Sequence, residues 1–153
     1  MTKIDLMKKA LCIAVTAHNG VKDKGGTDYV LHPITVALMC KTYDEKIVAL
    51  LHDVIEDTPL TLDDIKKQGF PEYIVSALDA VTRRKPEEQF GDKRFDYIVR
   101  CKKNPIARVV KIADLTHNSD LTRSPCPTDD FKKKVLYEYP SEIAYLKNKE
   151  INI

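Results

Sequence analysis

Four polar side chains that could bind a metal ion or move a proton lie within six consecutive residues. His52 and Asp53 are adjacent, and Glu56 and Asp57 follow them closely. The surrounding residues from 47 to 55 are otherwise apolar, which predicts one helix on which these four positions fall within an arc of roughly 140°. Three carboxylates and an imidazole in one cleft would be strongly unfavourable without a compensating cation. A divalent metal ion would supply that charge.

A solvated helix end is the alternative interpretation of this hexapeptide. Glu56 and Asp57 directly precede Thr58-Pro59, where a helix could end in solvent. Acidic side chains at a helix C-terminus interact unfavourably with the helix dipole, which weakens that alternative. The hexapeptide by itself leaves both interpretations open.

Three further positions are candidates because of where they stand. His32 stands at the predicted start of a helix, and Asp114 lies one turn before Asn118 on the same face of another. His18 directly precedes a glycine-containing loop. Each has an ordinary structural explanation when taken singly. His32 could be a polar residue at a helix start, Asp114 a surface acid or a partner for Lys111, and His18 a capping or hydrogen-bonding residue.

The elements that must position these residues are predicted to be helices throughout. Apolar residues recur at spacings of three and four, and no run alternates as a strand would. Asp44 is the expected cap of the helix that carries His52, and Pro140 is expected to divide the last helical region. The predicted fold class is therefore all-α, an irregular helical bundle. The expected helical segments are 4–18, 33–38, 44–57, 61–69, 71–81, 95–99, 106–115 and 131–146, with a flexible excursion at 83–91 and a break at 124–128.

The composition is that of an ordinary folded protein. Of the 153 residues, 43% are hydrophobic and 31% are charged, and the formal net charge is only +2. One domain over residues 1–153 fits this length, and neither a nucleic-acid partner nor a membrane partner is expected. The N-terminal segment lacks the apolar core of a signal peptide, so we expect a cytoplasmic protein; the sequence alone assigns no oligomeric state. The four scattered cysteines form no Cys-x-x-Cys and are expected to be small packing residues.

Together with their flanking residues, the candidates resemble a known set of motifs. One His, an adjacent His-Asp pair and a distant Asp form the pattern of the HD superfamily. Within it, the chain most resembles the hydrolase domain of RelA/SpoT-type proteins, including their small stand-alone relatives. The phrases that carry the resemblance run in family order over residues 17–118: Ala17-His18-x-Gly20, Tyr29-Val30-Leu31-His32-Pro33, the run from Ala49 to Thr58, Ala80-Val81-Thr82, and Lys111-Ile112-Ala113-Asp114 with His117-Asn118.

The resemblance implies that the irregular helical bundle is of the HD-domain type, and it implies an activity and a set of roles. Such hydrolases use Mn²⁺ to remove the 3′-pyrophosphate of guanosine tetra- and pentaphosphate, (p)ppGpp. The implied cofactor is thus one divalent ion, Mn²⁺, and the implied partner is a small-molecule nucleotide; no synthetase or regulatory domain is expected in a chain of this length. By position, the residues that resemble the metal ligands are His32, His52, Asp53 and Asp114, those that resemble the water-activating acids are Glu56 and Asp57, and those that resemble substrate contacts are Lys24 and Asn118.

Two acidic residues depart from the family's pattern. Asp23 stands where the family's loop usually carries a basic residue, and Asp120 stands where an Arg commonly follows the His-Asn pair. Each change could alter ligand preference by roughly a few kcal/mol. The alternatives to (p)ppGpp are therefore another nucleotide or small phosphoester, or a non-catalytic nucleotide sensor. The basic residues that could compensate are Lys22, Arg83, Arg84 and Arg123.

Overall fold

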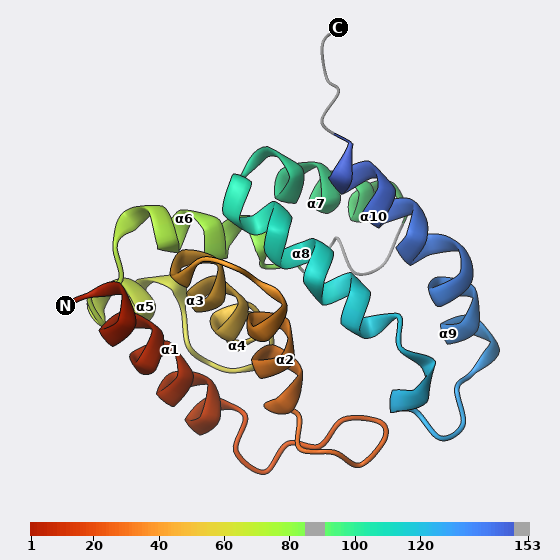
Figure 1. The fold of residues 1–153 in the computed structure, drawn as a ribbon, viewed down its shortest axis with the longest axis horizontal. Coiled ribbons are helices and arrows are strands. Elements are labelled where there is room, and N and C mark those ends of the chain that lie inside the picture. Colours follow the sequence, from red (N-terminus) through yellow and green to blue (C-terminus); the bar gives the residue numbers. More distant parts are fainter. Residues whose placement is uncertain (85–90, 149–153) are drawn as a thin grey trace, which may run out of the picture.

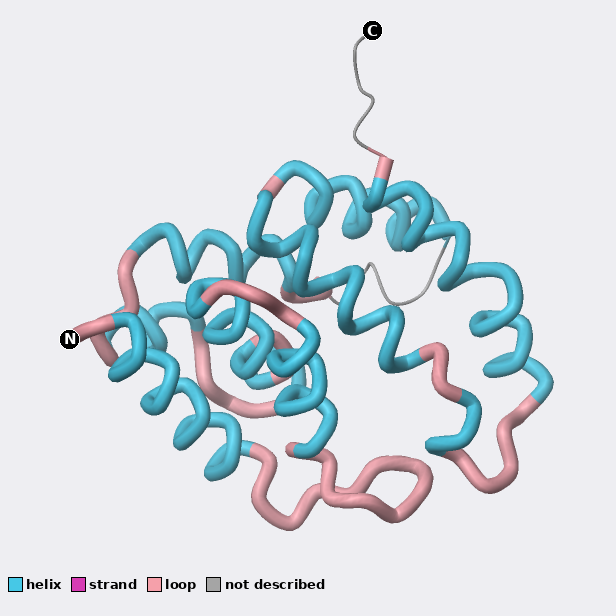
Figure 2. The backbone as a smooth tube through the Cα atoms, viewed as in Figure 1, coloured by secondary structure: helices cyan, strands magenta, loops and turns pink. Residues whose placement is uncertain are grey.

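The computed structural model describes residues 1–84 and 91–148, and helices dominate this part of the chain (Figures 1 and 2). Among these residues there is no β-strand, only an isolated bridge between Lys22 and Asp28. The prediction of an all-α fold is confirmed. The stretch 83–91, expected to be a flexible excursion, lies mostly outside the described residues. The elements in chain order are α1 (Lys3–Ala17), α2 (Leu31–Met39), α3 (Tyr43–Leu51), α4 (Val54–Asp57), α5 (Leu62–Lys67), α6 (Glu72–Val81), α7 (Gly91–Lys103), α8 (Pro105–Asn118), the 3₁₀ turn η2 (Leu121–Arg123), α9 (Asp129–Lys133), the π-helical turn η3 (Lys134–Glu138) and α10 (Tyr139–Lys147).

Threonine side chains begin three of these helices with a capping box. Thr2, Thr42 and Thr61 each accept a hydrogen bond from the backbone N–H three residues later, and the acidic residue there accepts one in return. The capping box expected at Thr61 is confirmed. For α3 the prediction is wrong, because the N-cap is Thr42 rather than Asp44. The carboxylate of Glu45 completes the capping box by accepting from the backbone N–H of Thr42.

The helix predicted to carry the hexapeptide is interrupted at His52 and Asp53. α3 ends at Leu51, and the single-turn helix α4 begins at Val54. In a continuous helix the carbonyl of Ala49 would accept the N–H of Asp53. Here Nδ1 of the His52 ring donates to that carbonyl at 2.6 Å. The prediction of one continuous helix is therefore wrong, and a helical arc does not describe how these side chains converge.

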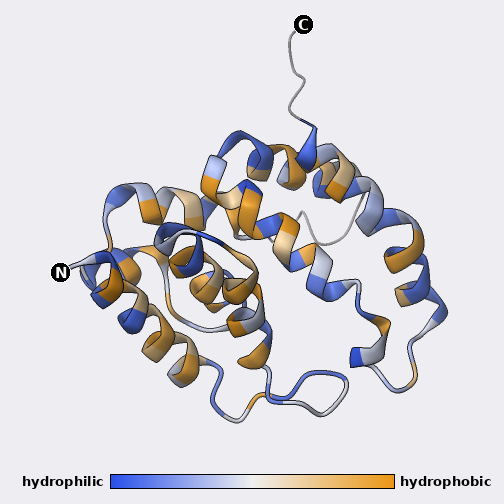
Figure 3. Cartoon of the chain, viewed as in Figure 1, coloured by the Kyte–Doolittle hydropathy of each residue, from blue (hydrophilic) through white to orange (hydrophobic). Residues whose placement is uncertain are grey.

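Two central helices, α3 and α8, fix the positions of His52, Asp114 and Asn118. α3 is buried along the whole of Ile47–Leu51 and packs against α1, α2, α6 and α8. α8 packs against α2, α3, α6, α7 and α10, and Figure 3 shows apolar residues interspersed with polar ones along it. Burial of each large apolar side chain in this way contributes about 1.5–3 kcal/mol to the free energy of unfolding. The packing therefore fixes the end of α3, where His52 lies, relative to Asp114 in α8.

The C-terminal region runs through a π-helical turn instead of a break. α9 leads into η3 and then into α10, with Pro140 in the first turn of α10. A proline has no N–H to donate, and the wider π turn before it accommodates the missing hydrogen bond without ending the helix. The predicted division at Pro140 is thus a local widening. The break expected at 124–128 is present between η2 and α9.

The other predictions about the chain have mixed outcomes. Cys40 and Cys101 are buried packing residues, as expected, whereas Cys12 and Cys126 are exposed, so the packing interpretation is wrong for those two. No helix in the described ranges has both the length and the apolar character that crossing a membrane requires.

Candidate metal centre and substrate cavities

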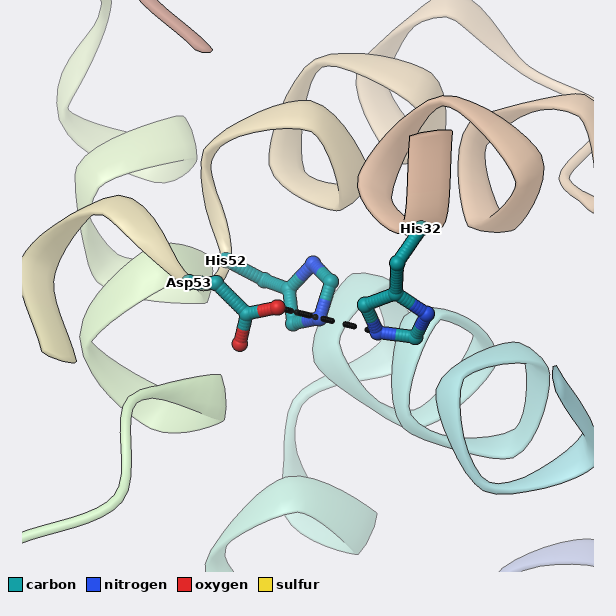
Figure 4. A group of neighbouring side chains, drawn as sticks. All are labelled: His32, His52 and Asp53. Carbon is teal, nitrogen blue, oxygen red and sulfur yellow. Dashed lines mark ion pairs between the residues drawn. The ribbon is translucent and has the colours of Figure 1, made fainter. Parts of the chain in front are cut away.

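Three side chains from neighbouring elements form a group that could hold a metal ion. His32 comes from the first turn of α2, His52 from the end of α3 and Asp53 from the link to α4, and their ligand atoms lie within 4.8 Å of one another. All three side chains are buried. Figure 4 shows the two imidazoles and the carboxylate facing one another, with dashed lines for the ion pairs between them.

Asp114 of α8 adds a second carboxylate to this group. Its Oδ1 lies 2.9 Å from Nε2 of His32 and 3.4 Å from Nε2 of His52. Its Oδ2 accepts a hydrogen bond from Nζ of Lys111 at 2.7 Å. Asp114 is therefore both a partner of Lys111 and a neighbour of the two imidazoles. The structure brings together all four residues that resemble metal ligands.

The Nε2 atom of His52 faces both carboxylates of this group. Because a carbonyl oxygen only accepts, Nδ1 of His52 must donate to Ala49, which leaves Nε2 directed into the group. Carboxylate oxygens of Asp53 and Asp114 lie 3.1 and 3.4 Å from Nε2, yet this buried atom has no hydrogen-bond partner within the described parts of the chain. Buried polar atoms normally have partners, and a metal ion would satisfy this one. The donor set therefore fits a divalent cation.

Charge interactions in the group also favour a cation. Burial opposes a charged imidazole, but Asp53 and Asp114 outweigh it and raise the pKa of His52 well above its usual value. Burial likewise opposes charged carboxylates, yet His52 lowers the pKa of Asp53 to about 2, and Lys111 holds the pKa of Asp114 well below its usual range. Both carboxylates stay ionised, and positive charge is drawn to Nε2 of His52. A metal ion can replace the proton there.

Two residues to which no role was predicted, Tyr29 and His117, contact the candidate metal ligands. The hydroxyl of Tyr29 donates to Oδ2 of Asp53 at 2.6 Å. Nδ1 of His117 lies 2.7 Å from Nδ1 of His32, and burial, with Arg123 and His32 adding to it, lowers the pKa of His117 to about 4. The neutral His117 ring can thus accept the proton of His32 Nδ1 and leave Nε2 of His32 for a metal ion. Two signals in the sequence pointed to them: both stand in the phrases that carry the resemblance, and each is three residues from a candidate ligand.

His18 remains close to the group without joining it. It is the C-cap residue of α1, which matches the capping role expected for it. Its ring is buried, and the centroids of the His18 and Tyr29 rings lie 5.1 Å apart.

The acidic pair Glu56 and Asp57 lines the same cavity as the candidate metal ligands. This cavity has a volume of about 170 Å³ and also reaches Arg83, Lys111 and Asn118. An Oε1 atom of Glu56 accepts the backbone N–H of Arg83. Burial, followed by the charge of Asp53, raises the pKa of Glu56 to about 7, although the Arg83 N–H opposes the shift. A carboxyl with this pKa can exchange a proton near neutral pH.

A larger cavity of about 710 Å³ lies beside the first and shares Tyr29, Asn118 and Tyr139 with it. Lys24 lines this larger cavity, so both residues that resemble substrate contacts reach it.

The two acidic residues that depart from the family's pattern, Asp23 and Asp120, both interact with other groups of the protein. Asp120 caps η2 through Thr122, and Asp23 faces the guanidinium of Arg123 at 3.8 Å.

Fold and site together define a class of protein: an all-helical bundle in which a buried histidine–carboxylate group that could hold a metal ion lies beside a cavity large enough for a small ligand. No family model matches the chain. It is 33% identical over 126 residues to the human guanosine-3′,5′-bis(diphosphate) 3′-pyrophosphohydrolase MESH1. The aligned region covers 77% of this chain and 68% of MESH1. The chain belongs to the family of guanosine-3′,5′-bis(diphosphate) 3′-pyrophosphohydrolases. The resemblance seen in the sequence is confirmed.

Two further comparisons agree with this assignment. The bifunctional (p)ppGpp synthase/hydrolase SpoT of Escherichia coli is 33% identical over 127 residues, or 76% of this chain. The chain spans only 18% of the length of that relative. A solved structure described as a metazoan ortholog of SpoT that hydrolyzes ppGpp superposes with a TM-score of 0.78, at 24% identity, over 96% of this chain and 88% of that one. This last likeness shows that the fold is shared.

Proposed function

We propose that this protein is a metal-dependent phosphohydrolase that removes the 3′-pyrophosphate of guanosine 3′,5′-bis(diphosphate), ppGpp. One observation carries the proposal: a buried His52 nitrogen, with no hydrogen-bond partner among the described residues, faces the carboxylates of Asp53 and Asp114 in the cavity that Glu56 and Asp57 also line. Membership of the pyrophosphohydrolase family supports the choice of ppGpp. In this proposal residues 1–153 act as one hydrolase domain, and a cytoplasmic location stays a prediction from the sequence.

The proposed metal ligands are His32, His52, Asp53 and Asp114. Two imidazoles and two carboxylates are a mixed nitrogen and oxygen set that suits Mn²⁺ and leaves coordination positions for water and phosphate. When bound, the ion would supply Lewis acidity, which lowers the pKa of water and withdraws charge from phosphoryl oxygens. The chain itself holds the ligand atoms in place through Tyr29, Lys111 and His117.

Glu56 and Asp57 are the proposed acid–base pair. With a pKa of about 7, Glu56 is partly deprotonated at neutral pH and can take a proton from an attacking water. The backbone N–H of Arg83 orients its carboxylate. The reaction proceeds without a covalent enzyme intermediate, and the 3′ group leaves as pyrophosphate.

Lys24 and Asn118 are the proposed substrate contacts. Both line the larger cavity, and Asn118 also reaches the smaller one, where it donates to Oδ1 of Asp114 at 3.1 Å. A nucleotide that spans the two cavities would therefore place its base and sugar in the larger one and its 3′ phosphates beside the proposed metal ligands.

A substrate panel tests this proposal. Purified protein is incubated with Mn²⁺ and either ppGpp, other purine and pyrimidine nucleotides, or small phosphoesters, and the released phosphate species are identified. The expected result is pyrophosphate release from ppGpp above all other substrates. Turnover of another nucleotide without pyrophosphate release from ppGpp would favour the alternative phosphohydrolase.

A second measurement addresses the non-catalytic sensor. The double variant Glu56→Gln with Asp57→Asn keeps the size of both side chains and removes the proposed proton acceptors. The variant is expected to bind Mn²⁺ and to lose turnover. If turnover by the purified variant survives, the assigned acid–base pair is wrong, whereas binding of ppGpp without turnover by the unmodified protein would identify a sensor.

A further inference from the structure

Arg123 lies where the loop after α1 meets the end of α8. Its Nη1 donates to the backbone carbonyl of His117 at 3.2 Å and to Oδ1 of Asn118 at 3.1 Å. Its Nη2 lies 3.8 Å from Oδ2 of Asp23, and only 25% of the side chain is exposed. Figure 1 shows the long loop between α1 and α2 on the same side of the molecule as the segment after α8. One side chain thus links two walls of the larger cavity.

The contact with Asn118 extends to the candidate metal centre. Because Oδ1 of Asn118 accepts from Arg123, its amide nitrogen is the atom available to Asp114, and Nδ2 donates to Oδ1 of Asp114 at 3.1 Å. This is the Asp114 oxygen that also faces His32 and His52. Arg123 therefore acts on a proposed metal ligand through an amide whose orientation it fixes.

The contact with Asp23 explains how an acidic residue is accommodated beside a cavity for an anion. Oδ1 of Asp23 accepts the backbone N–H groups of Gly25 and Thr27, both at 2.9 Å, while Oδ2 faces Arg123. Both oxygens are engaged within the protein, so the negative charge is countered locally. An arginine at position 23 would instead place like charge next to Arg123.

The backbones of the two walls also touch beside this ion pair. A Cβ atom added at Gly25 would lie 2.1 Å from the carbonyl oxygen of Arg123, so no larger residue fits without moving one of the walls. The ion pair and this close approach hold the loop that carries Lys24 against η2.

We propose that Arg123 is a positioning residue of this site: it fixes Asn118 against Asp114, and through Asp23 it holds the Lys24 loop over the larger cavity. This inference rests on the proposed function for the identity of the metal ligand and the substrate. It assigns two separable effects to one guanidinium. The Asn118 contact governs metal binding and turnover, whereas the Asp23 contact governs substrate affinity.

Three variants separate the two effects. Arg123→Met removes every donor at similar length, Arg123→Lys keeps the charge without the planar fork, and Asp23→Asn keeps the oxygen that caps the loop while removing the ion pair. Lys67→Met is the matched control, because Lys67 pairs with Asp63 at 3.2 Å but is 74% exposed and lines neither cavity. For each protein we would measure the thermal melt, the affinity of the metal-free form for Mn²⁺ alone by calorimetry, and kcat and KM for ppGpp.

Arg123→Met is expected to weaken Mn²⁺ binding about 10-fold and to lower kcat, as the loss of a group that orients a ligand does. Arg123→Lys is expected to recover part of both. Asp23→Asn is expected to raise KM several-fold while Mn²⁺ affinity stays within about twofold. Lys67→Met is expected to match the unmodified protein in all four quantities.

Two results would overturn the inference. One is a Mn²⁺ affinity for Arg123→Met equal to that of Lys67→Met; the other is an equal loss of Mn²⁺ affinity in Asp23→Asn and Arg123→Met, which would indicate general loosening. If Arg123→Met does not fold, Arg123→Lys takes its place. An equal loss of Mn²⁺ affinity in Arg123→Lys and Asp23→Asn would then overturn the inference. If the unmodified protein binds Mn²⁺ but releases no pyrophosphate from ppGpp, the proposed function fails, and the Mn²⁺ affinities still decide the role of Arg123.

Discussion

Nζ of Lys111 donates to Oδ2 of Asp114 at 2.7 Å, and this bond leaves Oδ1 of the same carboxylate facing the imidazoles of His32 and His52. Lys111 is buried, with Nζ 5.0 Å from the centre of the Tyr97 ring. The lysine therefore does two things for the site. It compensates the buried charge of Asp114, and it restrains the carboxylate so that one oxygen stays directed toward the proposed metal ion.

Replacing this lysine should affect folding and metal binding together. Lys111→Met leaves the Asp114 carboxylate buried without its cation, so the free energy of unfolding of the metal-free protein is expected to fall by about 3 kcal/mol. Mn²⁺ affinity is expected to fall about 10-fold because the carboxylate is no longer restrained. Urea denaturation and calorimetry measure the two quantities. An unchanged Mn²⁺ affinity would show that the Lys111 bond does not orient Asp114 for the metal.

Removal of the Tyr29 hydroxyl changes one hydrogen bond to a proposed metal ligand without removing a charge. Tyr29→Phe removes the donor to Oδ2 of Asp53 and keeps the ring, so Mn²⁺ affinity is expected to fall about 10-fold, in line with the ~1.5–3 kcal/mol of a hydrogen bond to a charged group. Tyr73→Phe is the matched control, because it also removes a tyrosine–aspartate hydrogen bond, to Asp44 at 3.1 Å, on the exposed surface. Equal Mn²⁺ affinities in the two variants would exclude a supporting role for Tyr29.

Stability of the metal-free protein should depend on pH through Glu56. Its pKa is raised from 4.5 to about 7, chiefly by burial, so between these values the folded protein keeps a proton that the unfolded chain releases. The stabilising effect of that proton is fully present below pH 4.5 and is lost as the pH rises through 7. Relative to Glu56→Gln in EDTA, the free energy of unfolding of the unmodified protein is expected to fall by up to about 3 kcal/mol from pH 5 to pH 8. Parallel curves for the two proteins would contradict the raised pKa.

Much of this architecture could be predicted from the sequence, because local signals set it. Apolar spacing predicted the helices, and the Thr61 capping box was visible as a motif. Convergence of His32, His52, Asp53 and Asp114 followed only from the resemblance, since these residues lie in separate parts of the chain: α2, the junction of α3 and α4, and α8.

What could not be predicted depends on contacts between a side chain and distant or backbone atoms. The break after α3 arises because the His52 ring competes for the Ala49 carbonyl, and apolar periodicity carries no trace of that competition. Likewise, Tyr29 gains its role only when the start of α2 packs against the end of α3, and His117 only when α2 and α8 pack together. The engagement of Asp23 by Arg123 joins residues 100 positions apart in the chain, so the sequence showed a charge reversal where the structure shows an ion pair.

Asp53→Asn tests the ligand set directly. The variant keeps the shape of the side chain but removes the charge, so bound metal and activity are expected to fall together. Asp63→Asn, on the exposed surface beside Lys67, is the control. The metal content of both proteins after Mn²⁺ loading and desalting is read by elemental analysis. Equal Mn²⁺ content in the two variants would count against Asp53 as a ligand.

The most direct test of the central claim is pyrophosphate release from ppGpp by protein stripped with EDTA, followed before and after addition of Mn²⁺. The account predicts no release from the stripped protein and rapid release once Mn²⁺ is restored, with guanosine diphosphate as the other product. Release that is insensitive to chelation, or none from the Mn²⁺-loaded protein, would contradict it.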